Sequence, residues 1–87
     1  MFFIYVLESI AHKRYYTGCT ANIDRRLMQH NLGNVKSTKS YKPWKVVYTE
    51  TFITKSEAFR REQQIKSYKS GDAFKKLIEN TERWQSG

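Results

Sequence analysis

The chain has 87 residues, which is enough for one domain with a single core. Its 16 lysines and arginines against 8 acidic residues give a formal charge of +8, which favours a polyanionic partner, DNA or else RNA. Cys19 is the only cysteine, so no intramolecular disulfide can form, and the histidines lack zinc-finger spacing. The apolar start is too short for a membrane span or a signal peptide. We expect a cytoplasmic protein without a membrane partner. The sequence leaves the oligomeric state open, with a monomer and an oligomer both plausible.

The first elements in chain order are two strands and a helix. Residues 2–7 are continuously apolar and aromatic, which predicts a strand buried on both faces. Residues 8–13 are polar and small, and residues 14–18 predict a second strand that forms a β-hairpin with the first. Asn22 as N-cap and Gly33 as stop predict a helix over about residues 23–31.

The second half adds one strand and two helices. After a basic loop at residues 33–43, alternating residues predict a third strand over about 44–50. A capping box at residues 54–57 predicts a helix that ends near residue 68, and a short last helix is expected at 73–80. The sequence therefore predicts an α+β fold, a small three-stranded antiparallel sheet flanked by helices in the order ββαβαα. We expect one domain over residues 1–80 and a polar tail at 81–87.

Several polar residues stand where the apolar stripes of the helices should continue. Arg26 and His30 fall on the inward stripe of the first helix, and Glu62 falls between the apolar positions of the second. A structural interpretation makes Arg26 a residue at the stripe edge, His30 a hydrogen-bonded residue near the helix end, and Glu62 an ion-pair partner of Arg26 or Lys66. A functional interpretation makes Arg26 a fork for a phosphate and Glu62 the ligand of one divalent cation.

The same two interpretations apply to the aromatic and basic residues. Tyr5 and Tyr16 lie in strands, where most tyrosines pack, but each carries a hydroxyl that needs a partner. Whether these two share a face depends on a register that the sequence leaves open. Between Arg25 and Thr49 there are six basic residues and no acidic one. From this stretch we expect nucleic-acid contacts by Arg25, Lys36, Lys39, Tyr41, Lys42 and Lys45.

The stretch from Tyr16 to Leu27, followed by His30, resembles the signature of the GIY-YIG nuclease superfamily, in particular its small stand-alone bacterial members. The two triplets of that family correspond here to Phe3-Ile4-Tyr5 and Tyr16-Thr17-Gly18. The resemblance extends from Phe2 to about Asn80. The same module occurs in the nuclease subunit of bacterial nucleotide excision repair and in some homing and restriction endonucleases.

The resemblance implies a set of catalytic residues, a metal ligand and a reaction. The catalytic residues would be Tyr5, Tyr16, Arg26, His30 and Glu62, with Glu62 as the metal ligand and Asn80 as a weak further candidate. Phe3 replaces a glycine of the family and Thr17 replaces a middle triplet residue, but neither change removes a chemical group. The implied reaction is hydrolysis of a DNA phosphodiester with one Mg²⁺ or Mn²⁺ ion, with Tyr5 favoured as the base.

Three functions remain open from the sequence. The first is a metal-dependent DNA endonuclease that is structure-selective or weakly specific and linked to DNA repair or recombination. The second is a nucleic-acid-binding adaptor that keeps the nuclease fold but has little or no activity. The third is a basic protein-interaction domain, which only the aromatic content supports.

Overall fold

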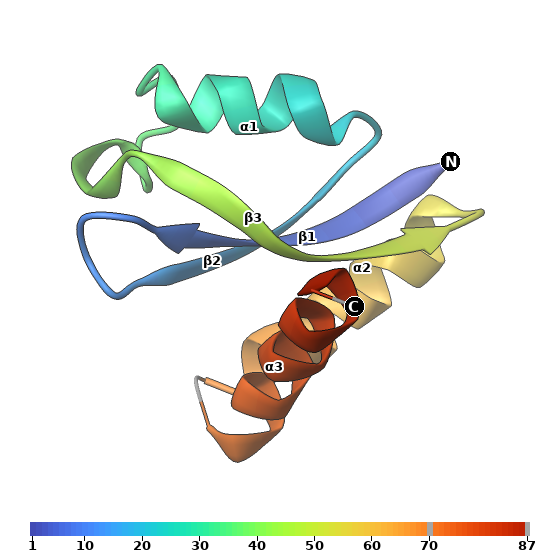
Figure 1. The fold of residues 1–87 in the computed structure, drawn as a ribbon. Coiled ribbons are helices and arrows are strands. Elements are labelled where there is room, and N and C mark those ends of the chain that lie inside the picture. Colours follow the sequence, from blue (N-terminus) through green and yellow to red (C-terminus); the bar gives the residue numbers. More distant parts are fainter. Residues whose placement is uncertain (70, 87) are drawn as a thin grey trace.

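The computed structural model describes residues 1–69 and 71–86, and the side chains of residues 1–69 and 71–79. Three strands and three α-helices follow one another in the predicted order (Figure 1). Their bounds are β1 Phe2–Ser9, β2 Tyr15–Thr20, α1 Ile23–Asn31, β3 Trp44–Phe52, α2 Lys55–Ser67 and α3 Asp72–Ser86, with one 3₁₀ turn, η1, at Lys39–Tyr41. The predicted fold class is confirmed.

The sheet has β1 in its centre, with β2 and β3 paired antiparallel on either side. The register between β1 and β2 sets Tyr5 opposite Gly18 and Leu7 opposite Tyr16. Directly paired residues point to the same face, so Tyr5 and Tyr16 are diagonal neighbours on one face. The register therefore answers the question that the sequence left open.

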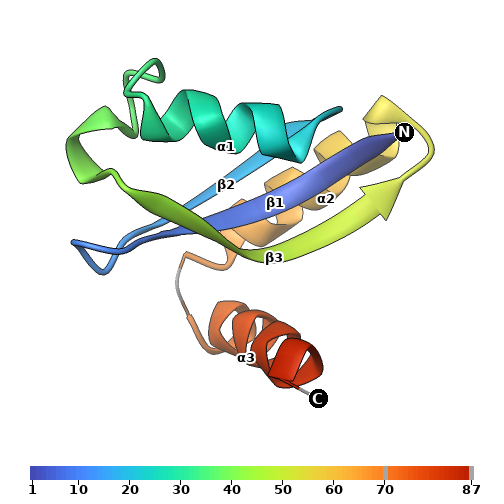
Figure 2. The same ribbon diagram turned by 45° about the horizontal axis from the view of Figure 1, so that its top comes forward.

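The helices cover opposite faces of this sheet. α1 lies over one face, whereas α2 and α3 lie against the other (Figures 1 and 2). The face beneath α2 and α3 holds the main apolar core, which consists of Ile4, Val6, Val47, Ala58, Ile65, Phe74 and Ile78. The face beneath α1 holds a smaller buried cluster of Tyr5, Leu7 and Trp44. β1 is buried on both faces because both layers pack against it, as its unbroken apolar sequence predicted.

The helix starts follow the predicted capping residues. The side chain of Asn22 accepts a hydrogen bond from the backbone N–H of Arg25 at 3.0 Å, and that of Thr54 accepts one from Glu57 at 3.2 Å. Gly33 follows α1 with φ +81°, a left-handed conformation that favours glycine.

Other boundaries lie further along the chain than expected. β2 continues through Thr20 and β3 through Phe52, because both strands keep pairing with the start of β1. α3 continues to Ser86, where the sequence led us to expect a helix end near Asn80 followed by a polar tail. No glycine or proline occurs between Asp72 and Ser86 to stop it.

Candidate active site

Tyr5 is the centre of a polar cluster on the α1 face. Its side chain is 2% exposed, since it lies on the central strand under α1. The phenol oxygen lies 3.1 Å from His30 Nε2 and accepts a hydrogen bond from Arg26 Nε at 3.4 Å. The spacing of four residues along α1 brings both of these side chains over the same strand position.

Gly18 leaves space for the Tyr5 ring because it has no side chain. These two residues are directly paired across β1 and β2, and a Cβ atom added at Gly18 would overlap the phenol oxygen and ring of Tyr5. No larger residue fits while the tyrosine keeps this position. The second triplet therefore ends in glycine because of a close approach between side chain and backbone.

His30 is fully buried and hydrogen-bonded through both ring nitrogens. Its Nδ1 lies 2.7 Å from the hydroxyl of Thr38, a residue that is itself 1% exposed. Burial, and then the positive charge of Arg26, lower the pKa of His30 to about 4. The ring is therefore neutral at physiological pH.

Arg26 and Tyr16 complete the cluster. The Tyr16 ring centroid lies 6.3 Å from that of Tyr5 and 5.0 Å from that of His30. The hydrogen bond to Tyr5 raises the pKa of Arg26, and Arg26 Nη1 donates to Gln29 at 3.0 Å. Arg26 also lines a polar pocket of about 360 Å³ at the end of β2, together with Cys19, Thr20, Ala21, Asn22, Arg25 and Gln29. A fixed guanidinium beside such a pocket can bind a phosphate group.

The ionisation of Tyr5 is governed by opposing effects. Burial is the largest and raises its pKa, the hydrogen bond from Arg26 lowers it, and the net direction is upward. The reaction that the family resemblance implies uses Tyr5 as the base, which requires its phenolate form. Arg26 acts in that direction but does not outweigh burial.

Glu62 lies on α2 and therefore approaches the sheet from the other face. Its side chain is 14% exposed and pairs with Lys66 at 2.8 Å, which is one of the two partners expected from the sequence. Its negative charge contributes to raising the pKa of Tyr5 and, after burial, that of Cys19. The carboxylate is thus close enough to the hairpin of β1 and β2 for its charge to act on both side chains.

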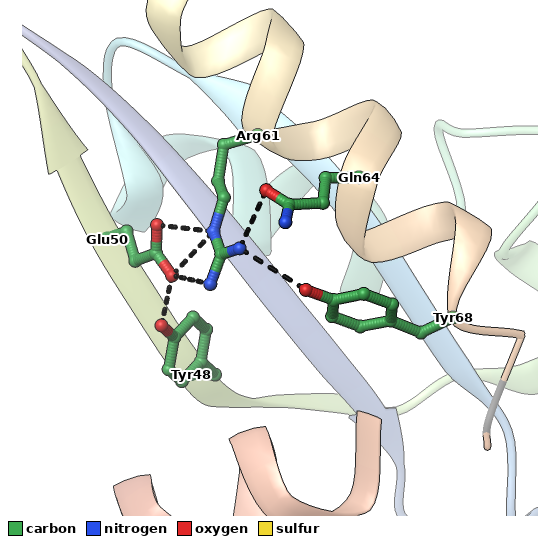
Figure 3. A network of polar contacts seen from close by, with 5 residues as sticks. All are labelled: Tyr48, Glu50, Arg61, Gln64 and Tyr68. Carbon is green, nitrogen blue, oxygen red and sulfur yellow. Dashed lines mark hydrogen bonds and ion pairs between the residues drawn. The ribbon is translucent and has the colours of Figure 1, made fainter. Parts of the chain in front are cut away.

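A second network holds α2 against β3. Arg61 donates from Nε and Nη2 to the carboxylate of Glu50 at 2.9–3.0 Å, and the hydroxyl of Tyr48 donates to the same carboxylate (Figure 3). Arg61 Nη1 also donates to Gln64 at 2.9 Å and lies 3.5 Å from the Tyr68 hydroxyl. Burial is the main cause that raises the pKa of Tyr48 to about 12. This network fixes the turn of α2 that carries Glu62.

A metal ion at Glu62 would need ligands beyond this protein's carboxylates. Among the described residues, no group of three or more histidine, cysteine, aspartate or glutamate side chains is arranged to hold a metal. Mg²⁺ commonly binds through one or two carboxylates and completes its shell with water and substrate phosphate oxygens. Glu62 fits such a site, in which the substrate supplies part of the shell.

The residues expected to contact nucleic acid lie around α1. Arg25 is exposed beside Arg26, whereas Lys36, Lys39 and Lys42 are exposed in the segment that follows α1. The ammonium group of Lys45, also exposed, lies 3.6 Å from the Glu8 carboxylate. Tyr41 is the aromatic residue of this set. It is half-buried, the guanidinium of Arg14 lies 4.5 Å from its ring centroid and the ring of His12 packs edge-on.

Two residues of this site were not identified from the sequence, and one candidate lies outside the described side chains. Thr38 is in a polar loop whose sequence did not predict that any of its residues would be buried. Only the fold shows that Thr38 is buried and hydrogen-bonded to the buried His30. Gly18 was noted as the end of the second triplet, but the sequence did not show that it makes room for the Tyr5 ring. Asn80 is in α3, and its side chain is outside the described part.

In residues 1–69 and 71–86, no helix is long and apolar enough to cross a membrane.

Comparison with known proteins gives a consistent result. The family model of the GIY-YIG catalytic domain matches residues 1–76. A UPF0213 protein of Syntrophus aciditrophicus is 39% identical over 83 residues, which cover 93% of this chain and 94% of the relative. Another, from Staphylococcus haemolyticus, is 43% identical over 65 residues, which cover 74% of this chain and 79% of the relative. The solution structure of a UPF0213 protein of Bacillus halodurans, 33% identical, superimposes with a TM-score of 0.57 and covers 91% of this chain and 84% of that one.

Proposed function

Because this chain belongs to the GIY-YIG family, alongside the small UPF0213 proteins, we propose that it is a divalent-metal-dependent endonuclease that hydrolyses DNA phosphodiester bonds. One observation carries the proposal. The Tyr5 hydroxyl is buried and held by both Arg26 and His30, beside a polar pocket that Arg26 also lines. Structural roles alone do not require a phenol, a guanidinium and an imidazole to converge at one buried point.

Tyr5 acts in this proposal as the base for hydrolysis. Its phenolate takes a proton from water, the water oxygen forms a bond to phosphorus, and the bond from phosphorus to the leaving oxygen breaks. The leaving oxygen then takes a proton from solvent. Arg26 stabilises the negative charge that grows on the phosphoryl oxygens, because its fork can bind two of them. Tyr16 packs against Tyr5 and His30 and orients them.

Glu62 is the residue that would hold the metal ion. A bound Mg²⁺ or Mn²⁺ ion would polarise a phosphoryl oxygen and favour the phenolate form of a nearby tyrosine. Glu62 would exchange its present partner, the exposed ammonium group of Lys66, for this ion. The network of Arg61 and Glu50 would keep α2 in place during that exchange.

The charge distribution favours a nucleic-acid substrate, and the family resemblance favours DNA within that class. The net charge is +8, and the exposed lysines and arginines around α1 can contact successive phosphates. Contacts with phosphates position the protein on the nucleic acid but do not distinguish one base sequence from another. We therefore propose weakly specific or structure-selective cleavage, with a role in DNA repair or recombination and RNA as the competing substrate.

A nicking assay tests the proposal directly. Supercoiled plasmid is incubated with the protein in Mg²⁺, in Mn²⁺ and in EDTA, beside the variants Glu62→Gln and Arg26→Ala. Exposed residues provide the matched controls Glu79→Gln and Arg60→Ala. We expect nicking only with metal, loss of at least about 100-fold in both site variants, and wild-type rates in both controls. A parallel assay on RNA of the same length compares the two substrates.

Two outcomes would contradict the proposal. Nicking that persists in both site variants would come from a contaminating nuclease. Metal-independent DNA binding without cleavage by the wild-type protein would instead support the nucleic-acid-binding adaptor.

A further inference from the structure

Thr38 connects a loop to the proposed base through a chain of buried polar groups. Its hydroxyl lies 2.7 Å from His30 Nδ1, and the Nε2 atom of the same ring lies 3.1 Å from the Tyr5 hydroxyl. All three side chains are at most 2% exposed. The backbone carbonyl of Thr38 accepts a hydrogen bond from the indole of Trp44 at 2.9 Å, which anchors the loop to the start of β3.

The hydroxyl proton of Thr38 has two acceptors within reach. One is His30 Nδ1 at 2.7 Å, and the other is the carbonyl oxygen of Val35 at 3.3 Å. That carbonyl already accepts from the backbone N–H groups of Thr38 and Lys39 at 3.1 and 3.0 Å. A carbonyl oxygen has two lone pairs, so the third and longest contact is the weakest. The proton is therefore better placed on His30.

We infer that Thr38 is a positioning residue that donates to His30 Nδ1 and thereby fixes the neutral imidazole in the tautomer with its proton on Nε2. In this tautomer Nε2–H donates to the oxygen of Tyr5, beside the hydrogen bond from Arg26. Two donors on one phenol oxygen stabilise its phenolate form, in opposition to the effect of burial. They also leave the proton of the neutral phenol without an acceptor at His30, which disfavours the neutral form. The opposite tautomer would make Nε2 an acceptor that retains the phenol proton. The catalytic consequence rests on the proposed function, whereas the tautomer itself does not.

The tautomer can be measured in the intact protein without substrate or metal. A long-range ¹H–¹⁵N correlation spectrum of protein labelled at histidine distinguishes a protonated ring nitrogen from a bare one. At pH 7 we expect a bare Nδ1 and a protonated Nε2 for His30. The exposed His12 gives the internal reference, with a mixture of the two tautomers. A protonated Nδ1 on His30 would overturn the inference.

Two substitutions at residue 38 separate the hydroxyl from the shape of the side chain. Thr38→Ser keeps the donor and should keep the His30 pattern. Thr38→Val keeps the shape, removes the donor and should change the tautomer ratio. The exposed neighbour provides the control Ser37→Ala. An unchanged His30 pattern in a folded Thr38→Val protein would contradict the inference. If that variant does not fold, the wild-type spectrum and the Thr38→Ala variant decide.

Nicking rates then test the consequence for catalysis. With saturating Mg²⁺ at pH 7, we expect Thr38→Val to be roughly tenfold slower than wild type and Thr38→Ser to be close to it, as for loss of one hydrogen bond to a charged group. If Thr38→Val has an altered tautomer ratio but nicks as fast as wild type, Thr38 does not contribute to catalysis. A wild-type protein that does not nick at all would contradict the proposed function and leave the tautomer result intact.

Discussion

The two faces of the sheet bury different kinds of side chain. Beneath α2 and α3 the buried cluster is apolar, from Ile4 on β1 to Ile78 on α3. Beneath α1 the buried side chains include Tyr5, His30 and Thr38, each with a hydrogen-bond partner. Burial of apolar groups stabilises a fold, whereas buried polar groups cost free energy unless they are paired. We conclude that one face provides most of the stability, whereas the other holds the proposed site residues except Glu62, which lies on α2.

Arg26→Lys should show the largest effect, and it should be on activity. A lysine keeps the charge but cannot bind two phosphoryl oxygens with a planar fork, so we expect the nicking rate to fall by about 100- to 1000-fold. The unfolding free energy should change by less than about 1 kcal/mol. Single-turnover nicking and urea denaturation measure the two quantities, with the exposed Arg60→Lys as the control. A near-wild-type rate would mean that Arg26 does not contact the reacting phosphate.

Ile65→Ala should show the converse pattern on the apolar face. Ile65 is 1% exposed, and its truncation should lower the unfolding free energy by about 3 kcal/mol. The activity of the folded fraction should remain close to wild type. Ile53→Ala is the matched control, since Ile53 is 82% exposed and should change stability by less than about 0.5 kcal/mol. Equal losses in the two variants would contradict the assignment of the core.

The buried histidine should make stability depend on pH. The pKa of His30 is about 4 in the folded chain and 6.5 when unperturbed, so between these values only the unfolded chain binds the proton. Stability is therefore complete above pH 6.5 and falls as the pH falls, by about 3 kcal/mol at pH 4. Urea denaturation of wild type and of His30→Gln across this range isolates the effect. If the unfolding free energies of the two proteins change with pH in the same way, His30 is not buried in its neutral form.

Gly18→Ala should lower both the stability of the protein and its nicking rate. The new methyl group must displace the Tyr5 ring, which should lower the unfolding free energy by about 2 kcal/mol. The nicking rate should fall together with stability because Tyr5 moves away from Arg26 and His30. The control Thr51→Ala changes an exposed residue of β3 outside this contact. A stable and fully active Gly18→Ala protein would exclude the close approach of Tyr5 to β2.

Arg61→Ala should have the smallest effect of the five. It leaves the half-buried carboxylate of Glu50 without its bidentate partner, and we expect a loss of about 1–2 kcal/mol in unfolding free energy. Arg60→Ala, on the exposed side of the same helix, should cost less than about 0.5 kcal/mol. If the two variants lose equal stability, the network in Figure 3 does not hold α2 in place.

The sequence alone determined the elements and the spacing of the site along the chain. Local patterns set the hairpin, the N-caps at Asn22 and Thr54, and the four-residue step from Arg26 to His30, because each depends on neighbours within a few residues. The local signals could not position the end of α3, since no stop residue marks it.

Only the tertiary structure decided how distant residues meet. The register paired Tyr5 with Gly18, and the loop after α1 brought Thr38 to His30. The packing of α2 on the opposite face brought Glu62 close enough to the hairpin for its charge to act on Tyr5 and Cys19. These contacts join residues far apart in the chain, so they depend on strand pairing and burial, which no short stretch of sequence specifies.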